Sequence, residues 1–105
     1  MRNFRGFDAP HLAMVAIDRR FNHYAMLDLG CWLQSVLLGA LSLGVATCAE
    51  ASLATFPAAV RGVLGIPEEL GLGVGIAMGY EAPAVKANGR RTTRAPLDAN
   101  VRFVG

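Results

Sequence analysis

The chain has 105 residues, of which 53% are hydrophobic and only 17% are charged. A single domain of this length hides about 60–70% of its unfolded surface, so the composition supplies more apolar material than a free monomer can easily bury. The net charge of +2 is too small to indicate a nucleic-acid partner by itself. A membrane segment, a permanent oligomer or part of a larger fold would each account for the apolar excess.

The first 25 residues contain one strand-like segment. The N-terminal stretch MRNFRGFDAP is polar and aromatic without an apolar core, so no signal peptide is predicted and we expect a cytoplasmic protein. The run HLAMVAID, residues 11–18, follows Pro10 and ends at charged residues. Its length favours a buried strand over a helix.

From Met26 to Leu43 the chain is apolar nearly all round a predicted helix of about five turns. Asp28 in the first turn of this helix suits the positive end of the helix dipole. A membrane span is disfavoured, because eighteen residues is the lower limit of length and Asp28 and Gln34 would be costly in lipid. We therefore predict a central helix that is covered partly by another polypeptide chain.

The remaining segments predict a small sheet and a C-terminal arm. After a short strand or turn, Pro57 and Gly65 delimit a short helix over residues 58–64. The run LGLGVGIAMGY, residues 70–80, favours a strand, and its glycines indicate that something packs very close to it. No helix follows it, so its likeness to GxGxxG is rejected. Residues 81–105 are expected to form an extended arm with a terminal strand, and the order of elements indicates an α+β or α/β fold.

The familiar catalytic and metal-binding patterns are missing from the sequence. His11 and His23 have no cysteine or carboxylate at ligand spacing, so we predict no metal site, and spacing singles out no catalytic residue. Cys31 and Cys48 lie in apolar stretches. We expect both to be small buried residues without a disulfide.

Four of the ten lysines and arginines gather in residues 86–94, with no carboxylate among them: Lys86, Arg90, Arg91 and Arg94. The planar guanidinium fork of arginine suits a phosphate group. On composition alone, a solvated basic loop is an equally good interpretation. A nucleic-acid partner is not predicted, because no aromatic residues are interleaved with the charges.

Five segments resemble, in their order along the chain, the C-terminal half of the FMN-dependent nitroreductase family, and within it the nitrobenzoate-reductase-like branch. They are LDLGCWLQSVLLGALSLGVATCAEASL, VRGVLGIPEE, GIAMGYEAP, NGRRTTRAPLD and VRF. The stretch FDAPHLAMVAIDRRF also resembles the strand that enters that half. The resemblance implies an α+β sandwich that forms an intertwined homodimer, with the helix from Met26 to Leu43 in the dimer core and two FMN molecules at the interface.

The activity that the resemblance implies is a ping-pong reaction. NAD(P)H reduces FMN, and the electrons then pass to a small acceptor such as a nitroaromatic or a quinone. The family's motifs carry over to four residues of this chain. Arg91 and Arg94 fall where the family places basic side chains on the FMN phosphate, and Glu50 and Ala51 fall where backbone groups approach the flavin ring near N5.

Residues 1–25 lack two features that the family's N-terminal half uses to hold FMN, an RxSxR segment and an Asn that reads the pyrimidine edge. We therefore interpret residues 1–105 as a partial nitroreductase-like domain, the C-terminal half without the N-terminal FMN clamp. The alternative is a non-catalytic remnant that keeps the dimer-forming helix and binds no flavin. The sequence leaves open the electron acceptor and the choice between NADH and NADPH.

Overall fold

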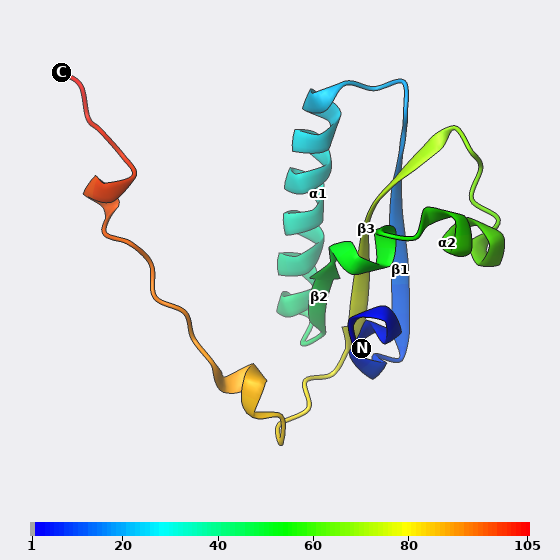
Figure 1. Ribbon diagram of the computed structural model, residues 1–105. Helices are drawn as coiled ribbons and strands as arrows, with labels where there is room; N and C mark the ends of the chain where they lie inside the picture. Colours follow the sequence, from blue (N-terminus) through cyan, green and yellow to red (C-terminus); the bar gives the residue numbers. More distant parts are fainter. Residues whose placement is uncertain (1) are drawn as a thin grey trace.

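Three antiparallel strands form the sheet of this protein, whose computed structural model describes residues 2–105 (Figure 1). Strand β1 spans His11–Asp18, β2 spans Ala46–Glu50 and β3 spans Leu70–Gly79. The order in the sheet is β1-β3-β2, so β3 is the central strand and pairs with both others. The predicted strands over residues 11–18 and 70–80 are confirmed, and the predicted short strand or turn after the long helix is the edge strand β2.

The glycines of β3 let two other elements approach its backbone closely. A Cβ atom built at Gly73 would lie 2.6 Å from Cδ2 of Leu29, and one built at Gly75 would lie 2.4 Å from Cδ1 of Leu53. Ile76 and Ala77, which follow on the same strand, are 2% and 4% exposed and form the centre of the core. The close packing expected from the glycine-rich sequence is therefore confirmed.

The long helix α1 spans His23–Ser42 and begins before the predicted start at Met26. Asn22 caps it, since its side-chain oxygen accepts a hydrogen bond of 3.0 Å from the backbone N–H of Tyr24. Asp28 consequently lies in the second turn, and the prediction that it occupies the first turn is wrong. The helix ends at Ser42, one residue before the predicted end, and Leu43 is its C-cap.

Helix α1 runs alongside the sheet and is covered on one side only (Figure 1). None of its residues is buried, although a stripe of them that includes Leu29 is half-buried toward the rest of the chain. Large apolar side chains remain exposed on the other side: Met26, Leu27, Trp32, Leu38 and Leu41. By length and mean hydropathy, 1.4 over its most apolar window, the helix could also cross a membrane.

The short helix α2 spans Pro57–Leu64 and ends at Gly65, whose φ of 64° is left-handed, so the predicted helix and both of its boundary residues are confirmed. Arg61 of α2 is only 8% exposed. Its guanidinium donates hydrogen bonds to the backbone carbonyl oxygens of Ile66 and Pro67, in the connection after α2, and of Leu70, the first residue of β3. This side chain therefore fixes the path of the chain into the central strand.

The C-terminal arm, residues 81–105, leaves the sheet at the end of β3 and runs away from it (Figure 1). It contains two short 3-10 turns, Lys86–Gly89 and Leu97–Ala99. No strand forms within it, so the predicted terminal strand is wrong; the arm has no neighbouring strand with which to pair. The Cα radius of gyration is 16.6 Å, against about 13 Å for a compact chain of this length.

Candidate functional site

The junction between β2 and the following 3-10 helix η2, Ala51–Ala54, carries two of the predicted site residues. Glu50 is the last residue of β2, faces Gly75 in the register of the sheet and is 5% exposed. Ala51 begins η2 and is exposed. Its carbonyl oxygen accepts a hydrogen bond of 3.4 Å from Oγ1 of Thr55. The junction thus presents an exposed backbone turn beside a buried carboxyl group.

The carboxyl group of Glu50 has no hydrogen-bond partner among residues 2–105, and both of its oxygens are shielded from solvent. Burial raises the pKa of Glu50 above its ordinary value, because the charged form loses its hydration. Cys48 lies two residues earlier, on the same face of β2. Burial, and then the charge of Glu50, raise the pKa of the Cys48 thiol.

Both cysteines are free and exposed, so the prediction that they are buried is wrong. Cys31 lies on the side of α1 that none of residues 2–105 covers, and Cys48 lies on an edge strand. An apolar sequence neighbourhood indicates burial only when another element covers the same face. Along these two segments the chain supplies no such element.

The other two predicted site residues lie in the arm. Nη1 of Arg91 donates a hydrogen bond of 2.9 Å to the carbonyl oxygen of Asn88, and Nη1 of Arg94 donates one of 2.6 Å to Oγ1 of Thr92. Both side chains are exposed, and the ion pairs found among residues 2–105 include neither of them. Two guanidinium groups without a carboxylate partner suit an anion such as a phosphate.

One copy of the chain does not bring the four predicted residues together. Glu50 and Ala51 lie beside the sheet, whereas Arg91 and Arg94 lie on the arm that leads away from it (Figure 1). The assignment of each pair to its part of FMN stays a prediction. The arginines offer free donors for the phosphate, and the exposed turn at Ala51 offers backbone that a planar ring can approach.

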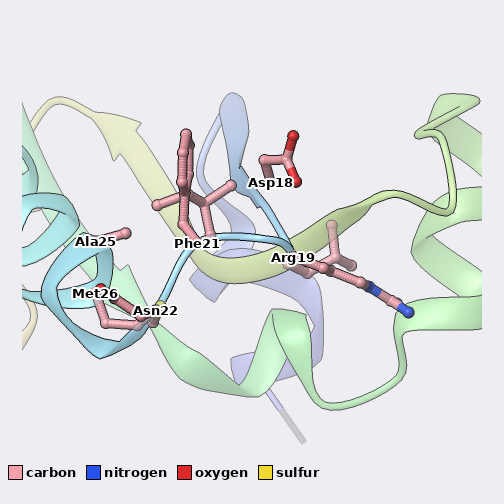
Figure 2. Close-up of a pocket in the computed structure, with 9 residues that line it drawn as sticks. Asp18, Arg19, Phe21, Asn22, Ala25 and Met26 are labelled. Carbon is pink, nitrogen blue, oxygen red and sulfur yellow. The ribbon is translucent and has the colours of Figure 1, made fainter.

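A recess of about 210 Å³ lies elsewhere, at the turn between β1 and α1 (Figure 2). Its lining includes Asp18, Arg19, Phe21 and Asn22. Arg20 holds the carboxylate of Asp18, with Nε 3.0 Å from each oxygen, and these hydrogen bonds lower the pKa of Asp18 to about 2. The recess shares no residue with the predicted site, and no sequence motif pointed to it.

The sequence did not predict the buried carboxyl group of Glu50. The resemblance to the family assigns a role to the backbone of this residue and none to its side chain. The alternation of side chains along β2 could have indicated this burial, because it places Glu50 on the same face of the strand as Ala46 and Cys48. Burial at the end of a short edge strand, however, depends on contacts from other segments, and Leu53 packs over Gly75, the register partner of Glu50. Local sequence does not reveal that contact.

Comparisons with known proteins connect this geometry to a family. The model of the nitroreductase family matches residues 1–80. A 4-nitrobenzoate reductase from Nocardioides sp. (strain LMS-CY) is 39% identical over 103 residues, which cover 98% of this chain and 42% of the relative. The FMN and NADPH-dependent nitroreductase NfnB from Sphigopyxis sp. strain HMH superposes with a TM-score of 0.94 at 32% identity, covering 99% of this chain and 47% of that chain. The FMN-dependent nitroreductase NfnB from Mycobacterium smegmatis, in complex with NADPH, superposes with a TM-score of 0.92 at 32% identity. The match covers 99% of this chain and 46% of that chain.

The chain spans about half the length of the curated relatives it matches. Its α+β fold, with a three-stranded antiparallel sheet, corresponds to part of the nitroreductase structures. The resemblance noted in the sequence is therefore confirmed, and the chain belongs to the nitroreductase family.

Proposed function

We propose that this chain is part of an FMN-dependent NAD(P)H oxidoreductase of the nitroreductase type, which reduces small acceptors such as nitroaromatics or quinones. One observation carries the proposal: 99% of the chain superposes on a nitroreductase described as FMN and NADPH-dependent. When bound, FMN would supply the hydride chemistry, with NAD(P)H as the electron donor. The chain itself would bind and orient the cofactor.

The two halves of the predicted site would have different tasks. Arg91 and Arg94 would hold the FMN phosphate, because their exposed forks can each donate two parallel hydrogen bonds to phosphate oxygens. The backbone of Glu50 and Ala51 would border the flavin ring, because the chain turns there from β2 into η2 and Ala51 is exposed. No side chain of this chain is assigned a proton-transfer step.

A homodimer through α1 would account for the uncovered side of that helix. A shallow recess of about 500 Å³ follows this side, lined by residues three and four apart: Met26, Leu27, Gly30, Cys31, Gln34, Ser35 and Leu38. Residues at this spacing form the rows along which helices pack against one another. A second copy would cover the recess, and its arm would bring Arg91 and Arg94 toward the β2–η2 junction of the first.

Flavin binding by the full chain tests the cofactor assignment. The protein is mixed with excess FMN, passed through gel filtration and examined for flavin absorbance and NAD(P)H oxidation. The double variant Arg91→Ala/Arg94→Ala should bind FMN at least about tenfold more weakly, because each charge-assisted hydrogen bond contributes about 1.5–3 kcal/mol. Arg102→Ala, which removes another exposed arginine of the arm, is the matched control.

Two results would count against the cofactor assignment. A colourless wild-type protein without NAD(P)H-dependent turnover would refute independent activity of this chain. Equal weakening by Arg102→Ala and by the double variant would show that overall charge, rather than the two assigned arginines, attracts the cofactor.

Sedimentation velocity tests the dimer. Leu38→Asp places a charge in the α1 recess and should convert the dimer into monomers, because an unpaired charge is costly at an apolar interface. Val63→Asp changes an exposed apolar residue on α2, 84% exposed, and should leave the dimer intact. A wild-type protein that sediments as a single monomeric species would refute the dimer.

A second candidate is a dimer-forming protein of the same fold that binds no flavin. The observation that favours it is the separation of Glu50 and Ala51 from Arg91 and Arg94 within a chain of about half the relatives' length. It predicts a stable dimer that remains colourless after incubation with FMN. The two measurements above, taken together, distinguish it from the oxidoreductase.

A further inference from the structure

The most unusual polar group of the described residues is the carboxyl of Glu50, which is sealed inside the chain without a partner. Both oxygens are inaccessible to solvent and neither accepts a hydrogen bond among residues 2–105. Glu50 is also the N-cap residue of η2, yet its side chain makes no capping hydrogen bond. The usual reasons for a carboxylate at this position of a helix therefore do not apply.

The charged groups of the surrounding elements do not compensate Glu50. Strand β3 and helix η2 contain no titratable side chain. Helix α2, which packs against η2, carries the buried Arg61, but its guanidinium donates hydrogen bonds to backbone carbonyl oxygens at Ile66, Pro67 and Leu70. The N-terminal 3-10 helix η1, Arg2–Asp8, packs against η2, but its Arg2 and Arg5 pair with its own Asp8 at 3.8 and 2.7 Å. On β2, the titratable neighbour is Cys48, whose ionised form would repel the carboxylate. The titratable residues of α1, which contacts β2, are all exposed: His23, Tyr24, Asp28 and Cys31.

Burying an ionised carboxylate without a hydrogen-bond donor or a cation is far more costly than burying the neutral acid. The neutral acid loses only the hydration of a polar group, whereas the ion loses the hydration of a full charge. The folded chain therefore favours the protonated form. Ionisation requires that the carboxylate reach water, and this in turn requires that the covering segment move.

We propose that Glu50 is a positioning residue, held as a neutral carboxylic acid, whose protonation keeps the β2–η2 junction closed. The segment that must open on ionisation is η2, because Leu53 packs over Gly75, the register partner of Glu50. The proton leaves to solvent as the junction opens. The inference rests on the proposed function in one respect: the β2–η2 junction is also the segment that we expect beside the flavin ring.

The sign of the pH dependence follows from proton linkage. The folded state binds the Glu50 proton more tightly than the unfolded state does, so the stabilisation is complete below the ordinary glutamate pKa of about 4.3. It is lost as the pH rises through the higher pKa of the folded state. Relative to Glu50→Gln, which cannot ionise, the wild-type folding equilibrium constant should fall by up to about tenfold per pH unit between about pH 4.3 and the folded-state pKa, and should level off above that pKa, where both states are ionised.

Infrared spectroscopy of the full chain, without added flavin, tests the proposal directly. As the pH is raised from 4, the C=O band of a protonated carboxyl group should persist in the wild type beyond the pH at which exposed glutamates ionise, and this persistent band should be missing from Glu50→Gln. Urea unfolding between pH 5 and pH 8 should show a pH-dependent loss of stability in the wild type and a flat profile in Glu50→Gln. The exposed Glu69 provides the control, because Glu69→Gln should keep both the band and the wild-type profile.

Hydrogen exchange at the amides of Ala51 and Ser52 locates the change. Above the folded-state pKa, these amides should exchange faster in the wild type than in Glu50→Gln at the same pH, and by a larger factor than amides at the centre of β3, which exchange only through global unfolding. A wild-type carboxyl band that disappears at the same pH as those of exposed glutamates would overturn the proposal. An unchanged pH slope in Glu50→Gln would also overturn it. Neither readout requires FMN, so failure here is distinct from failure to bind the cofactor.

Discussion

Replacing Gly75 with alanine tests whether η2 is held in place by close packing on the central strand. The added Cβ would lie 2.4 Å from Cδ1 and 2.8 Å from Cβ of Leu53. Rotation of the leucine side chain can relieve the first contact. It cannot relieve the second, because Cβ is fixed to the backbone of η2. The substitution must therefore displace η2 itself.

The expected loss follows from two opposing terms. Overpacking of a well-packed site costs about 1–3 kcal/mol. Replacing a strand glycine with alanine returns about 0.5–1 kcal/mol, since alanine loses less backbone entropy on folding. The two terms leave a net loss of up to about 2.5 kcal/mol. Because the contact with Cβ of Leu53 requires η2 to move, Gly75→Ala should lower the free energy of unfolding by an amount in the upper part of this range, about 1–2 kcal/mol, measured by urea denaturation at a fixed protein concentration. Gly62→Ala is the control: nothing lies within 4 Å of its Cβ position in α2, so it should stabilise the protein by about 0.5–1 kcal/mol.

A double-mutant cycle shows whether Leu53 is the cause. Removing the leucine side chain in Leu53→Ala leaves space beside Gly75, so the double variant should be less destabilised than the sum of the two single variants by about 1 kcal/mol. Additive losses would refute the reasoning, because they would mean that the new Cβ meets something other than Leu53. A Gly75→Ala variant as stable as the wild type would refute it as well.

Two further substitutions test the loop after α2 and the turn after β1. Arg61→Ala should lower the free energy of unfolding by about 2–4 kcal/mol in urea denaturation, because it leaves three backbone carbonyl oxygens without their charged donor; a loss below about 0.5 kcal/mol would show that the loop holds without it. Because Arg20 lowers the pKa of Asp18 to about 2, the stabilisation from this pair should be present above about pH 4 and lost as the pH falls toward 2. Asp18→Asn should flatten that acid limb, and an acid limb identical to the wild type would contradict the pairing.

Elements with local boundary signals could be predicted from the sequence, and those defined by distant contacts could not. Helix α2 was delimited correctly because Pro57 and Gly65 act on their own backbone. The start of α1 was missed because its cap, Asn22, lies in a polar stretch that reads as a break in the pattern. The exposure of Cys31 was missed because burial depends on what covers a helix face, and within the described part of the chain nothing covers that side of α1.

For the candidate site too, the segments could be selected from the sequence, whereas their arrangement in space could not. The segments that carry Glu50, Ala51, Arg91 and Arg94 could be selected from their resemblance to a family, and the structure places one pair at a strand end and the other on the arm. Whether the pairs meet depends on contacts beyond a single copy. The isolation of the Glu50 carboxyl could not be foreseen, because burial of a side chain and the absence of a hydrogen-bond partner among residues 2–105 depend on tertiary contacts.

The arm has a practical consequence for following assembly. Its four basic residues between positions 86 and 94 are cleavage sites for trypsin, and all four are exposed on a segment that runs away from the sheet. Exposed segments of this kind are preferred targets of proteases. Digestion should remove the arm readily while it extends from a single copy, and slowly once it is docked on another polypeptide. The rate of tryptic cleavage would therefore report docking of the arm without any added label.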